Sequence, residues 1–98
     1  MTMRTPIHPG EVLKDELEEI GISAAELSRQ LRVPENRMSE IIRGRRNVTA
    51  DTALRLGKWF GTSALFWLNL QKSYELRCAE QAMGNDINQI QPRVAVAT

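Results

Sequence analysis

Residues 23–46 read Ser-Ala-Ala-Glu-Leu-Ser-Arg-Gln-Leu-Arg-Val-Pro-Glu-Asn-Arg-Met-Ser-Glu-Ile-Ile-Arg-Gly-Arg-Arg and predict two short helices joined by a tight turn. Ser23 and Glu26 have the spacing of a capping box at the start of the first helix, residues 24–31. Pro34 lacks an amide hydrogen, so it can begin a second helix at no cost. Two helices joined in this way are typical of a helix-turn-helix, which presents its second helix to the major groove of DNA.

The second predicted helix, residues 34–43, has an apolar and a polar face. At about 100° per residue, Met38, Ile41 and Ile42 share the face that packs inward. The residues that we expect to contact base edges lie on its other sides: Asn36, Arg37, Ser39 and Arg43. Asparagine can form two hydrogen bonds with adenine, and arginine can do so with guanine. A solvent-exposed polar face without a ligand is the alternative interpretation.

Phosphate contacts are expected on either side of this helix. The expected residues lie at the start of the first helix and in the loop after the second: Ser23, Arg45, Arg46 and Asn47. Glu40 is close to this surface, where phosphates would repel its carboxylate. It can accept a hydrogen bond from cytosine, or it can hold Arg37 or Arg43 in position through a helical pair. We expect the second role.

Charge is distributed unevenly along the chain, although the net charge is only +1. Residues 11–26 contain six acidic residues and one basic residue, a net charge of −5. Residues 29–58 contain eight basic and three acidic residues, a net charge of +5. This basic segment coincides with the helix-turn-helix and would attract a polyanion, whereas the acidic segment would repel it. The alternative is two solvated faces of opposite sign.

The composition favours one small domain and argues against several classes of protein. The 98 residues include no apolar run long enough to cross a membrane and no apolar signal core, so we expect a cytoplasmic protein. The lone Cys78 cannot form an internal disulfide. Because no catalytic triad, phosphate-binding glycine loop or metal-ligand spacing is present, we expect no enzyme, no cofactor and no metal site. His8 precedes a helix and is expected to cap it or to form a buried hydrogen bond; a metal ligand or catalytic base is the alternative.

Three further helices are expected around the helix-turn-helix, which gives an all-α fold. They cover about residues 9–19, 50–60 and 64–83, and the last two begin after a threonine and a serine that can act as N-caps. Residues 1–84 then form one DNA-binding domain. Residues 85–98 are expected to form an extended or flexible tail that could pair as a strand with another chain.

The helix at residues 64–83 is longer than a helix-turn-helix core needs, about 30 Å at 1.5 Å per residue. It has two apolar edges. One edge can close the domain, whereas the other needs a second partner. The expected dimer or partner surface comprises Phe66, Trp67, Leu70 and Tyr74. The second edge comprises Leu65, Leu68, Leu76, Ala79 and Met83, and the sequence leaves open which edge closes the domain.

Two sequence motifs outside the helix-turn-helix indicate one protein family more narrowly than the helix-turn-helix does, because many repressors share the latter. Ile7-His8-Pro9-Gly10-Glu11-Val12-Leu13 begins the first helix, and Trp67-Leu68-Asn69-Leu70-Gln71 lies in the last one. Together with the helix-turn-helix, they resemble the HigA/VapI-type antitoxins of the XRE helix-turn-helix superfamily. The resemblance implies a five-helix, lambda-repressor-like domain. It also implies a homodimer that binds a palindromic operator in its own promoter, and a HigB/RelE-like toxin partner that cuts mRNA.

The leading hypothesis is therefore a dimeric DNA-binding antitoxin that represses its own toxin–antitoxin operon. One alternative is a stand-alone XRE-family regulator without a toxin, whose sequence would look nearly the same. Another is a protein-binding antitoxin that does not read DNA, against which the basic segment argues. The acidic residues of the first helix, among them Asp15 and Glu19, are expected to face a toxin that is basic around its active site. Alternatively, these acids only solubilise the helix.

Overall fold

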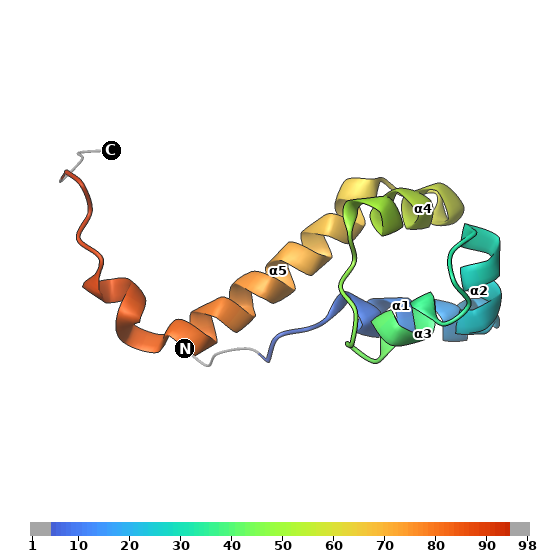
Figure 1. Cartoon of the computed structure of the whole chain (residues 1–98), viewed down its shortest axis with the longest axis horizontal. Coiled ribbons are helices and arrows are strands. Elements are labelled where there is room, and N and C mark those ends of the chain that lie inside the picture. Colours follow the sequence, from blue (N-terminus) through green and yellow to red (C-terminus); the bar gives the residue numbers. More distant parts are fainter. Residues whose placement is uncertain (1–4, 95–98) are drawn as a thin grey trace.

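The computed structural model describes residues 5–94, and this part of the chain contains helices and no strand. The elements are α1 (Pro9–Ile20), α2 (Ala24–Leu31), α3 (Arg37–Ile42), α4 (Ala50–Phe60), α5 (Ala64–Met83) and the 3-10 helix η1 (Gly84–Gln89). The expected all-α architecture with five α-helices is confirmed. Figure 1 shows α1 to α4 gathered at one end of the molecule, with α5 leading away from them toward the C-terminus.

The helix ends follow the predicted capping chemistry. Ser23, Thr49 and Ser63 precede α2, α4 and α5, and the hydroxyl of each accepts a hydrogen bond from the backbone N–H three residues later. Gly21 and Gly61 follow α1 and α4 in the left-handed conformation, which glycine adopts without steric cost. These residues therefore set where each helix of the core begins or ends.

The capping box predicted at Ser23 is only half formed. The Ser23 hydroxyl caps α2, but the carboxylate of Glu26 does not reach back to the cap. It accepts hydrogen bonds from the side chains of Arg29, at 2.9 Å, and Gln30, at 3.1 Å, because both lie one turn further along the same helix face. The prediction was wrong about the second half of the box.

A complete capping box begins α1 instead. Nδ1 of His8 accepts a hydrogen bond from the N–H of Gly10 at 2.9 Å, and the Glu11 carboxylate accepts one from the N–H of His8 at 3.2 Å. Burial lowers the pKa of His8, against smaller opposing effects of the Asn47 side chain and the Glu11 carboxylate. The lowered pKa favours the neutral imidazole that this cap requires, and the predicted capping role of His8 is confirmed.

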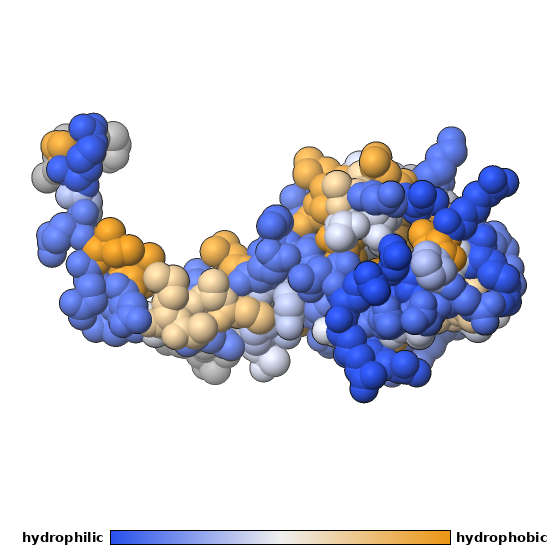
Figure 2. All heavy atoms as spheres, in the orientation of Figure 1, coloured by the Kyte–Doolittle hydropathy of each residue, from blue (hydrophilic) through white to orange (hydrophobic). Residues whose placement is uncertain are grey.

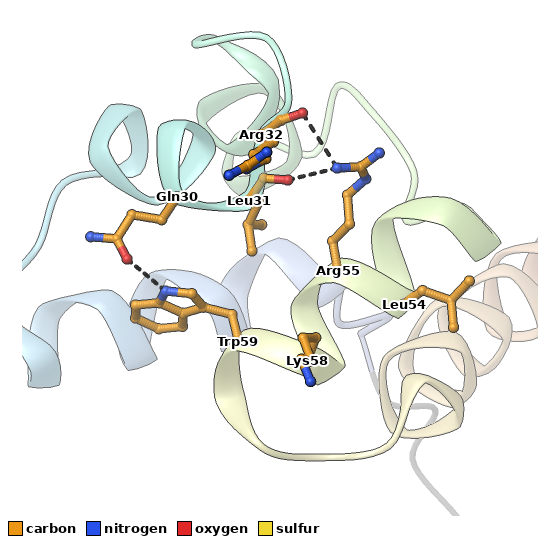
Figure 3. Close-up of a pocket in the computed structure, with 7 residues that line it drawn as sticks. All are labelled: Gln30, Leu31, Arg32, Leu54, Arg55, Lys58 and Trp59. Carbon is orange, nitrogen blue, oxygen red and sulfur yellow. Dashed lines mark hydrogen bonds between the residues drawn. The ribbon is translucent and has the colours of Figure 1, made fainter.

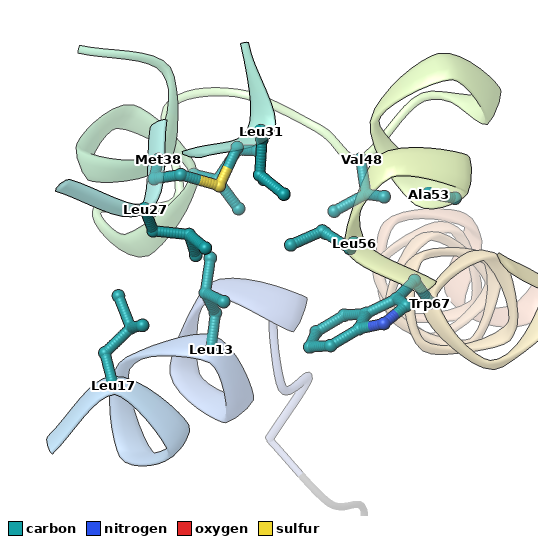
Figure 4. Close-up of a cluster of buried hydrophobic side chains, with 10 residues drawn as sticks. Leu13, Leu17, Leu27, Leu31, Met38, Val48, Ala53, Leu56 and Trp67 are labelled. Atoms are coloured by element: carbon teal, nitrogen blue, oxygen red, sulfur yellow. The ribbon is translucent and has the colours of Figure 1, made fainter. Parts of the chain in front are cut away.

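The hydrophobic core lies between the four helices of the compact end and the first turns of α5 (Figure 4). Its buried side chains are Leu13, Leu17, Leu27, Leu31, Met38, Ile41, Val48, Ala53, Leu56 and Trp67. Met38 and Ile41 come from the predicted inward face of α3, whereas Ile42 is half-buried. The core therefore fixes α3 against its neighbours and leaves the opposite side of that helix in solvent.

The second helix of the helix-turn-helix is shorter than the predicted range of residues 34–43. Pro34 and the two residues after it form a turn in which the N–H of Arg37 bonds the carbonyl of Pro34 at 2.9 Å. This tighter spacing delays the α-helical pattern until Arg37. Asn36 is consequently the residue before α3, with φ −89° and ψ 0°.

The tail differs from the prediction in its first part. Gly84–Gln89 form η1, and an extended conformation begins only at Ile90. The 3-10 turn forms because the N–H of Ile90 closes it on the carbonyl of Ile87 at 3.2 Å. No strand is found among residues 90–94, and Val96, which was part of the predicted tail strand, lies outside the described residues.

The second half of α5 projects from the domain as an arm. The described molecule measures 52 × 24 × 22 Å, and the arm accounts for its length. Large apolar side chains are exposed along the arm and η1: Leu76, Met83, Ile87 and Ile90. Figure 2 shows the corresponding apolar patches. No helix within residues 5–94 combines the length and the hydropathy that crossing a membrane demands.

Candidate nucleic-acid interface

The crossing of α2 and α3 depends on Ser28. Its side chain is fully buried, and its Oγ accepts a hydrogen bond from the backbone N–H of Met38 at 3.1 Å. A larger side chain at this position would separate the helices, and a side chain without an acceptor would leave the N–H of Met38 buried and unpaired. The small side chain of Ser28 thus lets the two helices approach, and its hydroxyl also holds the start of α3.

The turn between the two helices contains a non-glycine residue in the left-handed region. Arg32 has φ 61° and ψ 44°, a conformation that costs an L-residue about 1–2 kcal/mol. The Arg55 guanidinium from α4 stabilises this turn, because its Nη1 donates to the carbonyl of Leu31 at 2.8 Å. The end of α2 is thus anchored to α4.

The chain reverses directly after α3 at Gly44. This residue has φ 74°, and the N–H of Arg45 bonds the carbonyl of Glu40 at 2.9 Å. The reversal folds the loop back along α3 and brings Arg46 beside Glu40, with Arg46 Nε 2.8 Å from Glu40 Oε1. The turn at Gly44 therefore ends α3.

Gln71 of α5 holds the far end of the same loop. Its side chain is 2% exposed, and its Oε1 accepts a hydrogen bond from the backbone N–H of Val48 at 2.7 Å. Its Nε2 donates to the Glu75 carboxylate at 2.8 Å. The loop that follows α3 is therefore fixed at one end by the helix itself and at the other by α5.

Replacing Gln71 with leucine should destabilise the fold by about 1–3 kcal/mol, because the buried N–H of Val48 would lose its acceptor. Urea unfolding followed by circular dichroism measures this free energy. Lys72→Leu is the matched control, since it places leucine at the neighbouring position of α5, where the side chain is 75% exposed. Equal unfolding free energies for the two variants would argue against this role of Gln71.

The four candidate base-contacting residues lie together at α3 but differ in their availability. Arg43 is exposed, and no ion pair or hydrogen bond of its side chain occurs within residues 5–94. Arg37 is half-buried and also without an acid partner in this range. The Ser39 hydroxyl donates to the carbonyl of Asn36 at 3.0 Å, and the Asn36 amide donates to Glu40 Oε2 at 3.2 Å.

The predicted partner of Glu40 was wrong. Glu40 binds Arg46 and Asn36 and contacts neither Arg37 nor Arg43 through a hydrogen bond or ion pair. The reason is the reversal after α3, which brings Arg46 to the carboxylate from outside the helix. The prediction considered only side chains one helical turn away.

The candidate phosphate-binding residues border α3. Arg45 and Asn47 are exposed in the loop after it. Arg46 is half-exposed, and although its Nε is bonded to Glu40, its two terminal nitrogens make no hydrogen bond within residues 5–94. The Ser23 hydroxyl is already engaged as the cap of α2, so a phosphate there would meet the first backbone N–H groups of that helix.

The excess positive charge of the basic segment is carried entirely by unpaired side chains. Each of its three acids has a basic partner in the segment: Glu35 binds Arg29, Glu40 binds Arg46, and Asp51 binds Arg55. The five other cations form no ion pair within residues 5–94: Arg32, Arg37, Arg43, Arg45 and Lys58. The net charge of +5 is thus available to a polyanion without breaking an internal pair.

No family model matches the chain. Individual proteins and solved structures do match it, and they indicate its family. Virulence-associated protein I of Dichelobacter nodosus is 51% identical over 76 residues, which cover 76% of this chain and 70% of that protein. The structure of the Pseudomonas aeruginosa antitoxin HigA with the higBA promoter is 48% identical, with a TM-score of 0.86, over 92% of this chain and 100% of that one. A HigA-family addiction module antidote protein from Coxiella burnetii is 46% identical, with a TM-score of 0.88, over 91% and 99%.

The chain belongs to the HigA family of helix-turn-helix antitoxins. The two motifs that carried the resemblance to HigA have structural roles in this chain. His8 begins α1, and Gly10 brings that helix against α3, since a Cβ on Gly10 would lie 2.0 Å from the carbonyl oxygen of Ile41. Trp67 fills the core, and Gln71 holds the loop after α3. Both motifs of this HigA-family chain therefore position α3 and the loop that follows it.

One residue of the predicted dimer surface is not on the surface of this HigA-family chain. Trp67 is 2% exposed, and its Nε1 donates to Thr62 Oγ1 at 3.1 Å, so it belongs to the core. It points inward because α4 packs along that side of α5.

The other three residues of the predicted dimer surface are at least partly accessible. Phe66 is 44% exposed, and Leu70 and Tyr74 are half-buried. Leu70 and Tyr74 line a hollow of about 250 Å³ between α5, α1 and the segment before it, together with Thr5, Ile7, Val12, Ser73 and Arg77.

A second hollow, of about 280 Å³, lies between the end of α2 and α4 (Figure 3). It is lined by Gln30, Leu31, Arg32, Leu54, Arg55, Lys58 and Trp59. Trp59 is half-buried, and its Nε1 donates to Gln30 Oε1 at 2.9 Å. Two of the five unpaired cations, Arg32 and Lys58, border this hollow. No cluster of three metal-ligating side chains was found in the described part of the chain.

Proposed function

We propose that this chain is a sequence-specific DNA-binding antitoxin that represses its own toxin–antitoxin operon. The observation that carries the proposal is the set of unpaired cations around an anchored α3, in a chain closely similar to an antitoxin solved with promoter DNA. The test is binding of the purified chain to the DNA upstream of its own gene, compared with random DNA of equal length. Equal affinity for both would contradict sequence-specific repression and leave a protein-binding antitoxin as the better description.

Asn36 and Arg43 are proposed to read bases, because both are exposed at opposite ends of α3. Asn36→Ala and Arg43→Ala should each weaken operator binding by about 1–3 kcal/mol and change binding to random DNA little. Competition assays with both DNAs measure the two effects. Arg37 and Ser39 are proposed to lie on the same base-contacting surface. The residues proposed to contact phosphates are Ser23, Arg45, Arg46 and Asn47. Equal losses on both DNAs would move Asn36 or Arg43 to the phosphate-binding set.

The proposal includes a homodimer on a palindromic operator. One helix-turn-helix reads only a few base pairs, whereas two copies on a two-fold axis can place their recognition helices about 34 Å apart, one turn of DNA. Phe66, Leu70 and Tyr74 offer an apolar surface on α5 for this contact. We expect a dimer in sedimentation at micromolar concentration and protection of an inverted repeat. A monomer that protects the full repeat with undiminished affinity would contradict this arrangement.

The proposed protein partner is a HigB/RelE-like toxin that cuts mRNA, and the chain itself is proposed to be a cytoplasmic protein without catalytic activity. The acidic face of α1 is the proposed encounter surface, because Asp15, Glu16, Glu18 and Glu19 are exposed and lie outside the basic segment. A stand-alone regulator is the alternative. Co-purification with the product of a toxin-sized neighbouring gene distinguishes the two.

A further inference from the structure

The carboxylate of Glu40 joins two residues with different expected roles at the DNA surface. Its Oε2 accepts a hydrogen bond from the Asn36 amide at 3.2 Å, and its Oε1 accepts one from Arg46 Nε at 2.8 Å. Asn36 precedes α3, whereas Arg46 lies in the loop after it. One side chain thus connects the residue before α3 to the loop after it.

These bonds leave the functional atoms of both partners free. Only one amide hydrogen of Asn36 is used, so its second amide hydrogen and its oxygen remain available for a base. Only Nε of Arg46 is used, so the two terminal nitrogens remain available for a phosphate. Glu40 can therefore hold both side chains during DNA binding without being displaced.

The carboxylate also has an electrostatic effect that does not depend on sequence. Its side chain is 30% exposed on a surface expected to meet phosphates, and it offsets the charge of Arg46. It must weaken binding to every DNA by repulsion. It can improve binding only where the two side chains that it orients meet the correct groups.

We propose that Glu40 is a specificity-determining positioning residue, which orients Asn36 toward its base and Arg46 toward its phosphate while disfavouring all other DNA. This inference rests on the proposed function of the chain as an operator-binding protein. Glu40 thus favours recognition of the operator despite its negative charge. It does so through its contacts with other side chains of the protein and not through contact with a base.

The test compares Glu40→Ala with Glu35→Ala on operator and random DNA. Glu35 is the matched control, because it is an acid of the same segment that also pairs with an arginine, Arg29, but is 69% exposed and does not contact Asn36. Both variants remove one negative charge and should bind random DNA more tightly. Only Glu40→Ala should reduce the ratio of operator to random affinity, by roughly tenfold, since a good base contact is worth that much discrimination.

A double-mutant comparison separates positioning from direct base contact. If Glu40 acts through Asn36, the single variant Asn36→Ala already removes the contribution of Glu40 to operator preference. Adding Glu40→Ala to Asn36→Ala should then reduce the ratio of operator to random affinity by no more than about twofold. Additive losses, or a loss of discrimination at a base pair that Asn36→Ala still reads, would overturn the proposal. So would an unchanged preference in Glu40→Ala.

A measurement without DNA checks the contact itself. In NMR spectra of the free protein, the Arg46 Nε–H signal should be protected from exchange in the wild type and in Glu35→Ala, and exposed in Glu40→Ala. An unprotected signal in the wild type would overturn the proposal. A wild type with this protected signal but without operator preference would instead contradict the proposed function, and the role of Glu40 in recognition with it.

Discussion

Gly10→Ala is expected to destabilise the chain more than any other substitution of a single small residue. The added Cβ would lie 2.0 Å from the carbonyl oxygen of Ile41 and 2.8 Å from the Cα of Ile42. These atoms are backbone, so α1 and α3 must move apart. We expect a loss of at least about 3 kcal/mol, the upper part of the range for overpacking. For a domain of this size, the loss corresponds to a decrease in Tm of roughly 12–24 °C.

Thermal unfolding followed by circular dichroism measures this effect, and Gly21→Ala provides the comparison. Gly21 has φ 86°, but a Cβ there would meet no atom within 4 Å. Its substitution should cost only the left-handed conformation, about 1–2 kcal/mol. If the two variants unfold at the same temperature, the close approach of α1 and α3 does not limit stability. Gly10→Ala should also weaken operator binding where it remains folded, because α3 would be displaced.

Operator binding is expected to decrease about 10³-fold between 50 and 200 mM salt. The basis is the set of five unpaired cations in each copy of the chain. If three of them in each half of a dimer reach phosphates, the plot of log affinity against log salt has a slope of about −5. Fluorescence anisotropy of labelled operator DNA across this salt range measures the slope.

Arg45→Ala and Arg29→Ala separate contact from overall charge in this experiment. Both remove one positive charge, but Arg45 is unpaired, whereas Arg29 is held by Glu26 and Glu35. Arg45→Ala should make the slope less steep by about one for each copy of the chain. Arg29→Ala should change it by much less. If both variants change the slope equally, then an arginine without an ion pair contributes no more to DNA binding than one that is paired with acids.

The helix ends of this fold were predictable from sequence because they depend on neighbouring residues. Ser23, Thr49 and Ser63 cap backbone groups three residues away, and Gly21 and Gly61 stop helices through their own conformation. The helix-turn-helix and its exposed polar side followed from the same short-range rules. The cluster of candidate DNA-binding residues around α3 therefore could be proposed from the sequence, although their contacts with DNA remain predictions.

The contacts that anchor this surface join distant parts of the chain and were not predictable in the same way. Gln71 binds Val48, 23 residues earlier, and nothing in either sequence segment indicates the other. The partner of Glu40 depended on how the chain reverses at Gly44. The burial of Trp67 depended on which edge of α5 faces α4, and both edges of that helix are apolar. Each of these features depends on tertiary packing and not on local propensity.

The projecting arm of α5 gives the molecule two levels of local stability. Backbone amides near Val48 and Trp67 can exchange with solvent only when the packed domain opens, which requires a large part of the unfolding free energy. Amides near Leu76 and Met83 lie on a helix whose side chains are exposed, so fraying of that end breaks few tertiary contacts. A protease should therefore cut the arm first and leave the domain that carries α3 intact. A partner bound along the arm would protect it and remove this difference in protease sensitivity. The rate of cleavage in the arm therefore measures the fraction of molecules with a partner bound.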